Sequence, residues 1–323
     1  MPQLYRQLST LSYARFSNAQ SNLGCSRDKN LAICKKTGAK IIQELPTTYL
    51  KKVGTALDDF KKIINRGHSG AVAFDYDGTL CDANERYEGP RLEIANKLKE
   101  ILEGGFLVAI ITGRGKSVRK DLQKCLPKKY WRKTIIGYYN GGQSSFLDDE
   151  NSPKTLINPD DFLSVLESHI SDFSELDKSA NITLRPGQLS VEWGRSPTWA
   201  LFKNKLDSVI ADARCEGYKV FESSHSIDII PQSISKLNTL SFCEVFLKKH
   251  TLPSEILCIG DKGRWPGNDS EFLKGKYSLS VDEVCSDLTS CWNFSKDGIR
   301  NVEATLAYLK AIRIGNKGIK IKI

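Results

Sequence analysis

The chain has 323 residues, of which 40% are hydrophobic and 26% are charged, and its formal net charge is +9. This length suits one large domain or two moderate ones, and no run approaches the roughly eighteen apolar residues of a membrane span, so we expect no membrane partner. The nine cysteines form no CxxC pair and the four histidines lack zinc-ligand spacing, which indicates a reducing compartment and no zinc site.

The positive charge lies at the two ends of the chain. Residues 1–70 carry 12 Lys or Arg against 4 Asp or Glu, and residues 310–323 carry five basic residues and no acid. Basic ends can bind nucleic acid or a protein, but no such motif accompanies them, and we favour a solvated extension at 1–54 and a solvated tail at 314–323. We expect a cytoplasmic protein. The alternative is mitochondrial, because the first 27 residues resemble a transit peptide in having no acid.

The first half of the chain alternates helices with short apolar strands. Helical spacing is found at 55–67, 90–105 and 115–126, and apolar runs follow at 71–75, 106–112 and 133–140. Apolar strands that are separated by helices predict a parallel sheet covered on both faces.

Residues 143–232 break this alternation. They have the pattern helix-strand-strand twice, with helices at 160–173 and 196–217 and strand pairs at 181–186 with 188–194 and at 217–223 with 226–231. The alternation resumes with a helix at 235–250, strands at 255–260 and 277–281 and a last helix at 301–312. We therefore predict an α/β protein whose Rossmann-like three-layer core, with a parallel sheet, covers 55–142 and 233–313. An α+β cap domain at 143–232 interrupts it.

Polar side chains follow three of the predicted strands. Asp75 ends the first strand, with Asp77 two residues later; Thr112 ends the second; Asp261 follows the strand at 255–260. The carboxyl ends of parallel strands meet at one edge of a sheet, where ligands bind. Carboxylates that share a crevice repel each other unless a hard cation binds them, so we expect Mg²⁺ there.

This set of side chains suits phosphoryl transfer. A carboxylate beside Mg²⁺ can attack a phosphoester and form an aspartyl-phosphate, and Asp75 suits this role. Asp77 suits the general acid and base. Gly78 lets the turn backbone approach a phosphate, and Thr112 offers it a hydroxyl.

Four segments resemble, in order, the signature motifs of the haloacid dehalogenase superfamily of phosphotransferases. They are DYDGTL at 75–80, IITGR at 110–114, the lysine of SKLNTL, and GDKGRWPGND at 260–269. The resemblance implies Asp75 as nucleophile, Asp77 as general acid and base, and Thr112 and Lys236 as catalytic partners. It places the metal among Asp75, Asp77 (through its backbone carbonyl), Asp261, Asn268 and Asp269. It places the substrate against Gly78, Gly113 and Arg114.

The inserted cap and the NGG at 140–142 resemble the type IIB cap branch of this superfamily, which includes trehalose-phosphate and sucrose-phosphate phosphatases and phosphomannomutases. The fourth motif is lengthened by KGRWPG, as in phosphomannomutase, which leaves open whether Asp261 and Asp269 both reach the metal. Candidate substrate contacts are Arg264 in this loop and, in the cap, Arg185, Glu192, Trp193 and Arg195. The alternative for these residues is packing and surface salt bridges.

We therefore predict a magnesium-dependent phosphomonoester hydrolase that acts through an aspartyl-phosphate on a small soluble phosphate ester, such as a phosphosugar or a nucleotide-like metabolite. Two alternatives stay open. The first is a phosphomutase of the phosphomannomutase type, and the second is a module that binds nucleic acid or a protein partner and retains the fold. The sequence assigns no oligomeric state.

Overall fold

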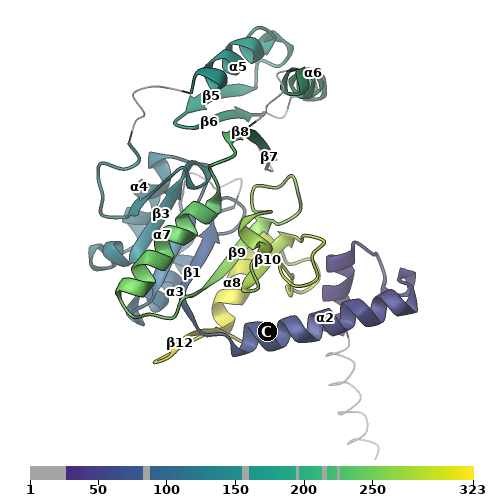
Figure 1. The fold of residues 1–323 in the computed structure, drawn as a ribbon, viewed down its shortest axis with the longest axis vertical. Helices are drawn as coiled ribbons and strands as arrows, with labels where there is room; N and C mark the ends of the chain where they lie inside the picture. Colours follow the sequence, from purple (N-terminus) through teal and green to yellow (C-terminus); the bar gives the residue numbers. More distant parts are fainter. Residues whose placement is uncertain (1–26, 83–87, 155–159, 194–195, 213–216, 224–225) are drawn as a thin grey trace, which may run out of the picture.

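The computed structural model describes residues 27–82, 88–154, 160–193, 196–212, 217–223 and 226–323. Its strands form two sheets (Figure 1). The larger has the order β10-β9-β1-β2-β3-β4, and the smaller has the order β5-β6-β8-β7. None of the helices in the described ranges is long and apolar enough to span a bilayer.

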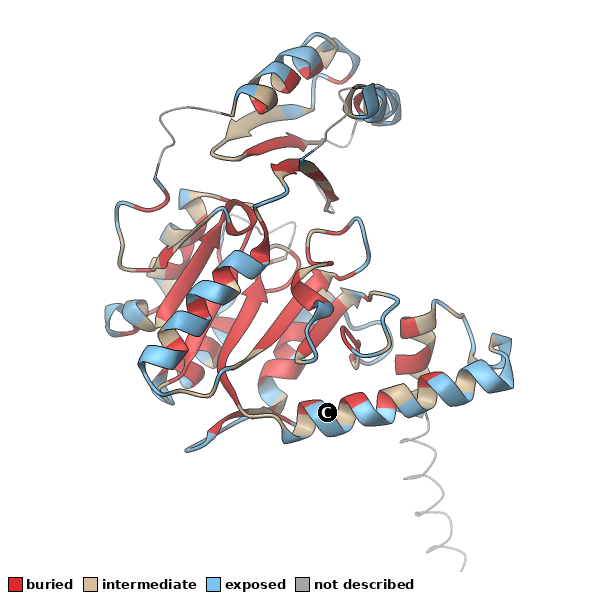
Figure 2. Cartoon of the chain, in the orientation of Figure 1, coloured by how far each residue is buried: buried red, intermediate tan, exposed pale blue. Residues whose placement is uncertain are grey.

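The larger sheet is the centre of the α/β core. Its parallel strands are β1 (Ser69–Asp75), β2 (Leu107–Ile111), β3 (Thr134–Tyr138), β9 (Glu255–Lys262) and β10 (Ser278–Glu283), and β4 (Gln143–Phe146) runs antiparallel to β3. All seven residues of β1 are buried, because apolar side chains cover both faces of the sheet. Figure 2 shows this burial as a continuous red sheet.

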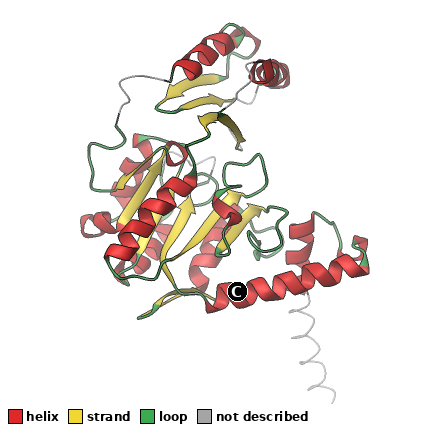
Figure 3. Ribbon diagram, in the orientation of Figure 1, coloured by secondary structure: helices red, strands yellow, loops and turns green. Residues whose placement is uncertain are grey.

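Helices cover both faces of this sheet (Figure 3). The helices α2 (Thr47–Arg66), α3 (Leu92–Glu103), α4 (Lys116–Cys125) and α8 (Asn301–Ala311) pack in the apolar cluster that contains Val72 and Phe74 of β1. The helix α7 (Lys236–Lys249) and the short η5 (Phe272–Lys274) pack in the cluster that contains Ala71 and Ala73. Alternate residues of β1 thus serve opposite faces, and the predicted three-layer α/β fold is confirmed.

The smaller sheet has the predicted helix-strand-strand pattern. Its elements in chain order are α5 (Asp161–Ser171), β5 (Asn181–Arg185), β6 (Gln188–Glu192), α6 (Trp199–Asp212), β7 (Tyr218–Glu222) and β8 (Ser226–Pro231). All of its pairings are antiparallel. Leu163, Leu166 and Ile170 of α5 and Phe202 and Leu206 of α6 are buried against its strands. We refer to this unit as the cap.

Residues 143–146 differ from the boundary that the sequence analysis predicts. They form β4, whose residues Gln143–Phe146 pair with Tyr138–Ile135 of β3, so they belong to the larger sheet and not to the cap. Short 3₁₀ helices connect the elements: η1 (Ile42–Glu44), η2 (Lys128–Lys133), η3 (Tyr139–Gly141) and η4 (Ser174–Leu176).

The ends of the chain also differ from the prediction of solvated tails. Residues 312–321 form a hairpin of β11 (Ile312–Gly315) and β12 (Gly318–Ile321), in which Ile319 and Ile321 are buried. Residue Ile319 pairs with Ser69 at the start of β1. Before α2, residues 27–37 are helical, with Ala32 and Ile33 in the core. Most of the basic residues in the described parts of both ends are therefore carried on packed helices and strands, whereas residues 1–26, on which the transit-peptide alternative mainly rests, lie outside the described residues.

Candidate active site

Asp75 lies at the carboxyl end of β1 and is 3% exposed. Strand pairing on both sides positions it, because its neighbour Phe74 pairs with β9 and Asp75 itself pairs with Ile111 of β2. Carboxylate oxygens of Asp75, Asp261 and Asp269 lie within 4.8 Å of one another, and all three residues are buried. The structure thus brings together Asp75 and Asp261, which the sequence placed at one edge of the sheet, and Asp269, which only the motif resemblance had suggested.

Lys236, the first residue of α7, neutralises part of this charge. Its Nζ donates to Asp75 Oδ1 and, at 2.6 Å, to Asp269 Oδ1. Ser235 caps the helix by accepting a hydrogen bond from the Leu237 backbone at 3.2 Å. Gly141 has φ +90°, and a Cβ there would lie 2.1 Å from the Ser235 carbonyl oxygen. The NGG segment therefore allows the close approach that brings Lys236 to the strand ends.

Burial governs the protonation of this cluster. Burial and the Asp269 carboxylate raise the pKa of Asp75 to about 7, against the opposing effect of Lys236. Burial, Asp75 and Asp269 also raise the pKa of Asp261. Burial alone would lower the pKa of Lys236, but the carboxylates of Asp269 and Asp75 raise it. One buried ammonium thus contacts two of the three neighbouring carboxylates, which leaves an excess of negative charge that a cation would offset.

The oxygen donors around Asp75 fit a hard divalent cation. Asn268 Oδ1 is buried, has no hydrogen-bond partner among the described residues, and belongs to a residue that lines the same pocket as Asp75 and Asp261. Gly78 has φ +84°, and a Cβ there would lie 2.4 Å from Asp261 Oδ2. A side chain at position 78 would therefore displace the Asp261 carboxylate. Oxygen ligands without nitrogen or sulfur suit Mg²⁺.

Asp269 has a different set of partners. Its Oδ2 accepts hydrogen bonds from the backbone N–H groups of Asp261 at 2.9 Å and Lys262 at 3.1 Å, and its Oδ1 accepts from Lys236. Both oxygens are thus used within the protein. These bonds hold Lys236 and the start of the fourth-motif loop in place, whereas Asp261 and Asn268 line the pocket itself.

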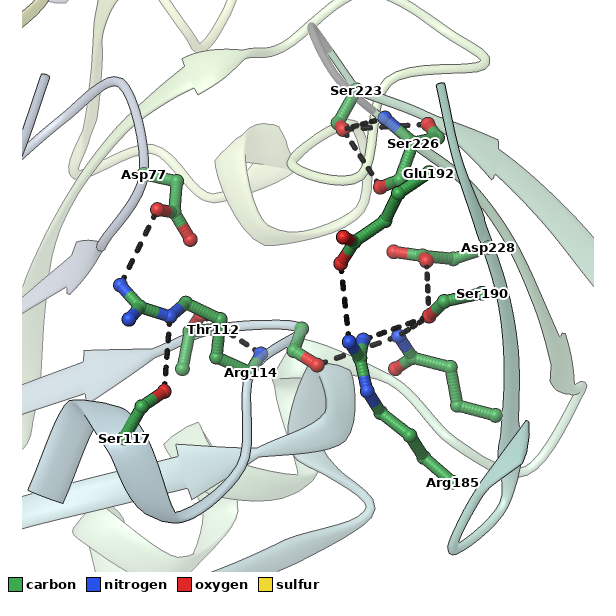
Figure 4. A network of polar contacts seen from close by, with 12 residues as sticks. Asp77, Thr112, Arg114, Ser117, Arg185, Ser190, Glu192, Ser223, Ser226 and Asp228 are labelled. Carbon is green, nitrogen blue, oxygen red and sulfur yellow. Dashed lines mark hydrogen bonds and ion pairs between the residues drawn. The ribbon is translucent and has the colours of Figure 1, made fainter. Parts of the chain in front are cut away.

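Asp77 and Arg114 face each other in the pocket (Figure 4). Arg114 Nη1 lies 3.5 Å from Asp77 Oδ1, and its Nη2 lies 3.5 Å from Asp121 Oδ2 on α4. The guanidinium also stacks over Tyr76 at 5.1 Å, and its Nε donates to Ser117 Oγ at 3.2 Å. Arg114 is 6% exposed and is held by protein groups on several sides. It lines the pocket and also lies against Asp77.

Thr112 follows β2 directly and is buried. Its backbone is fixed by a hydrogen bond from its own N–H to the Gly137 carbonyl at 2.9 Å, and its carbonyl accepts from Asn140 at 2.8 Å. Its Oγ1 accepts from the Arg114 backbone at 3.1 Å and lies beside the pocket with Gly113. The hydroxyl hydrogen can therefore point to a ligand.

The cap closes the pocket with polar side chains (Figure 4). Arg185 donates to Ser190 Oγ at 2.9 Å and to Glu192 Oε1 at 3.1 Å, and Ser190 donates to Asp228 Oδ1 at 2.8 Å. Gln188 accepts from Asn140 Nδ2 of the core at 3.1 Å. The cap residues that line the pocket are Arg185, Gln188, Glu192, Ser223, Ser226 and Asp228. The space between them and the core residues is about 30 Å³.

The edge strand β7 of the cap docks on the long fourth-motif loop. The Glu222 backbone N–H donates to the Pro266 carbonyl at 3.0 Å, and the ring of Phe221 lies 5.8 Å from that of Trp265. Lys219, which is 7% exposed, donates to Glu271 Oε2 at 3.0 Å. Glu271 also accepts from Ser235 Oγ at 2.8 Å. We call these contacts the β7 latch. Ser235 precedes Lys236 in the chain, and Glu271 follows two residues after Asp269, so the β7 latch is linked to both of these buried residues.

Several residues that the sequence suggested as substrate contacts lie elsewhere. Arg264 is exposed and is absent from the pocket lining of the described residues, because the loop turns its side chain outward toward Gly38. Trp193 stacks on Trp199 within the cap at 4.9 Å, which is a packing role. Arg195 lies outside the described residues.

Four cap residues at the pocket were not predicted from the sequence: Gln188, Ser190, Ser226 and Asp228. Their signal is the alternation of β6 and β8, in which polar residues occupy every second position of otherwise apolar strands. Ser190 pairs with Asp228 and Glu192 with Ser226 in the sheet register, so these polar positions share one face. That face looks toward the pocket, while Leu189, Val191, Ile227 and Ile229 pack on the cap helices.

Comparison with known proteins supports the fold. No family model and no curated protein matches the chain. Among solved structures, the chain is similar to the C-terminal domain of trehalose-6-phosphate phosphatase from C. albicans, with 15% identity, a TM-score of 0.52, and coverage of 80% of this chain and 94% of that one. It is also similar to an IMP-bound, N-terminally truncated IMP-nucleotidase from Plasmodium falciparum, with 12% identity, a TM-score of 0.52, and coverage of 88% and 78%.

These likenesses define the class of fold. The chain shares with these two proteins an α/β core with an inserted cap, which is the fold that the resemblance of its four motifs implies. At these identities the likeness extends to the fold, and the chemistry rests on the residues of the site.

Proposed function

We propose that this protein is a magnesium-dependent phosphomonoesterase that acts through an aspartyl-phosphate on a small phosphate ester. The observation that carries the proposal is the position of Asp75, which ends β1 in contact with Lys236 and shares a pocket with Asp77, Thr112, Asp261 and Asn268. The fold shared with two phosphate-ester hydrolases supports the reaction class.

The metal would be held by Asp75, Asp261, Asn268 and the backbone carbonyl of Asp77. When bound, Mg²⁺ would offset the charge of the carboxylates and of the phosphoryl oxygens. Lys236 adds a second positive charge and holds the Asp75 carboxylate through Oδ1. Thr112 Oγ1 and the backbone of Gly113, which line the pocket, would donate hydrogen bonds to phosphoryl oxygens. The Gly78 N–H instead donates to the Cys81 carbonyl at 2.7 Å, so the part of Gly78 is to leave room for the Asp261 carboxylate.

The reaction would take place in two steps. A carboxylate oxygen of Asp75 attacks phosphorus, the ester P–O bond breaks, and Asp77 gives its proton to the leaving oxygen. A water molecule then replaces the leaving group, Asp77 takes a proton from it, and its oxygen attacks phosphorus. The P–O bond to Asp75 breaks and inorganic phosphate leaves. Arg114, which lies 3.5 Å from Asp77, holds that carboxyl group beside the leaving oxygen.

The cap favours a hydroxyl-rich leaving group. Among the described residues of the cap, the pocket is lined by two carboxylates, Glu192 and Asp228, and by one cation, Arg185, which is already bonded to Glu192. Carboxylates, amides and hydroxyls bind sugar hydroxyls well, while a second phosphate would meet net negative charge. Among small phosphate esters, this favours a phosphosugar.

The cap must also move to admit such a substrate. A space of about 30 Å³ holds one or two water molecules and is too small for a phosphosugar. We infer that the β7 latch opens to admit substrate and closes around it, which would exclude bulk water during the first step.

A screen of purified protein for phosphate release tests the proposal. We expect release from phosphosugars that depends on added MgCl₂ and is abolished by Asp75→Asn. Conversion of a sugar 1-phosphate to its 6-phosphate without release of phosphate would instead indicate the phosphomutase alternative. Full magnesium-dependent release by the Asp75→Asn variant would contradict the assignment of the nucleophile.

A further inference from the structure

Two cysteines and a buried lysine form a cluster away from the pocket. Cys285 and Cys291 lie in the segment between β10 and α8, and the Cys285 backbone N–H donates to Cys291 Sγ at 3.4 Å. Cys285 is half-buried and Cys291 is fully buried. Neither of the two cysteines takes part in a disulfide in the structure. A pair of neighbouring thiols of unequal exposure suits thiol–disulfide chemistry.

Lys36 reaches this pair from the helical residues 27–37. It is 5% exposed, and its Nζ donates to the carbonyl oxygens of Ser290 at 2.7 Å and Cys291 at 3.2 Å. The third contact of Nζ is Cys285 Sγ at 3.7 Å. An ammonium has three donors, so all of them have a partner, and two of these partners are neutral carbonyls.

A buried ammonium needs an opposite charge, and the cluster provides one in Cys285. No carboxylate among the described residues lies within 4.0 Å of Lys36 Nζ, and the nearest charge contribution from a carboxylate is that of Asp287 at longer range. The Cys291 thiol and, against the effect of burial, the Lys36 ammonium lower the pKa of Cys285 to about 5. Ser290 Oγ lies 3.9 Å from the same sulfur. A thiolate at Cys285 would therefore be stabilised from three sides.

We propose that Cys285 and Cys291, together with Lys36, form an oxidisable dithiol site whose substrate is a hydroperoxide. The Cys285 thiolate attacks one peroxide oxygen, the O–O bond breaks, and the released oxide takes a proton to give water or an alcohol and a sulfenic acid on Cys285. The Cys291 thiol then attacks the sulfenic sulfur, loses its proton to the leaving hydroxide, and forms a disulfide and water. Two thiols are oxidised by two electrons, and one peroxide is reduced.

The site adjoins the fourth-motif loop. A Cβ at Gly263 would lie 2.4 Å from Cys291 Sγ, so this sulfur packs directly on the backbone two residues after Asp261. The N-terminal extension thus has a role beyond packing in the core, because it supplies the cation of the site. The chemistry of the two thiols does not depend on the proposed phosphatase activity, and its test does not use that activity.

The test is residue-resolved labelling of the full-length reduced protein with iodoacetamide between pH 6 and 8, read by mass spectrometry. We expect Cys285 to react at least about tenfold faster at pH 6 than Cys34 and Cys125. Burial raises the pKa of both comparison thiols, that of Cys125 to about 11. The rate at Cys285 should be nearly independent of pH, and theirs should rise about tenfold per pH unit. Equal rates at pH 6 would overturn the proposal.

A matched pair of variants tests whether Lys36 activates the Cys285 thiol or only anchors residues 27–37 to the core. Lys35 also joins residues 27–37 to the segment before α8, through Ser295 O at 2.6 Å and Asn293 Oδ1 at 3.2 Å, but no sulfur contact of Lys35 is found among the described residues. We expect Lys36→Met to slow the labelling of Cys285 at pH 6 at least tenfold and Lys35→Met to leave it within about twofold. If both variants slow labelling equally, the assignment of Lys36 is wrong.

The disulfide is tested with hydrogen peroxide. One equivalent should produce a Cys285–Cys291 disulfide with the loss of two hydrogen atoms, and Cys291→Ser should instead give a sulfenic acid on Cys285 that dimedone traps. If the wild-type protein forms no such disulfide while Cys285 is overoxidised, the resolving role of Cys291 is refuted. Because the labelling rates and the disulfide are both read on the folded wild-type chain, these two tests hold even if a variant folds poorly.

Discussion

The two aspartates at the end of β1 have different surroundings. Asp75 contacts Lys236 and lies among buried carboxylates, whereas Asp77 lies beside Arg114 at the wall of the pocket. Two residues of the same type can therefore have different roles within one turn, since the nucleophile needs a fixed, desolvated position and the proton donor needs access to the leaving oxygen.

This difference predicts how the Asp77→Asn variant depends on the leaving group. An alkoxide must be protonated as it leaves, whereas p-nitrophenolate leaves readily without a proton. We expect Asp77→Asn to lower kcat on a sugar phosphate by about 10²- to 10⁴-fold, and the first step with p-nitrophenyl phosphate by much less. Pre-steady-state release of p-nitrophenol measures this step. Asp75→Asn serves as control and should be inactive on both; an equal loss on the two substrates in Asp77→Asn would refute the general-acid role.

At the scale of elements, the β7 latch accounts for the length of the fourth-motif loop. The inserted residues are those that meet β7: Pro266 accepts from Glu222, and Trp265 packs on Phe221. The length of this loop was the feature that suggested a phosphomutase. Its contacts with the cap provide a reason for the length that is compatible with hydrolysis.

The latch predicts an effect of Lys219→Met on substrate binding. Removing a buried ammonium leaves Glu271 without its cationic partner, so the closed cap should be less stable. Partial burial would raise the pKa of Glu271, but its hydrogen bonds from Ser235 and Lys219 lower it. We expect KM for a phosphosugar to rise about tenfold. The exposed pair of Lys178 and Glu175 elsewhere in the cap provides the control, and Lys178→Met should change KM less than twofold. Similar effects of both variants would argue against the latch.

The C-terminal hairpin is a second element with a measurable effect. Ile321 is 2% exposed, whereas Ile314 of the same hairpin is 39% exposed. We expect Ile321→Ala to lower the free energy of unfolding by about 2–4 kcal/mol and Ile314→Ala by less than about 1 kcal/mol. The midpoint of urea unfolding, followed by circular dichroism, measures both. Equal and small losses of unfolding free energy would show that the hairpin contributes little to the core, and would support the prediction of a solvated C-terminal tail.

At the scale of the whole molecule, the acidic cluster couples stability to metal and to pH. An ordinary aspartate has a pKa near 3.9 in the unfolded chain, while the pKa of Asp75 in the folded protein is raised to about 7 and that of Asp261 is also raised. Between about pH 4 and 7 the folded protein therefore binds more protons than the unfolded chain. Without metal, its stability should fall as the pH rises through this window.

Magnesium should reverse this loss, because it binds the ionised carboxylates. We expect 10 mM MgCl₂ to raise Tm more at pH 7.5 than at pH 5.5, where protons compete with the metal; saturation to 100 times Kd corresponds to about 2.7 kcal/mol. Differential scanning calorimetry measures the shift, and Asp261→Asn should remove it. A shift in Tm that is equal at both pH values would contradict the assigned site.

Much of the fold and part of the site could be predicted from local patterns. Asp75, Asp77, Thr112 and Asp261 directly follow apolar strands, and parallel strands bring their carboxyl ends together whatever the connecting loops contain. The helix-strand-strand pattern of the cap is equally local, because side-chain periodicity reflects which face of an element is buried. Lys236 was found through its resemblance to a known motif, since nothing in its own neighbourhood marks it.

The contacts between distant elements could not be predicted in this way. Arg264 and Asp228 are both charged residues whose local sequence does not say which way the side chain points. In the structure, the side chain of Arg264 is exposed and that of Asp228 lines the pocket. The approach of Lys219 to Glu271, of Lys36 to Cys285 and of β12 to β1 depends on how whole surfaces pack. Side-chain periodicity indicates that one face of an element is buried, but the shape and charge of the folded chain determine which surface covers that face.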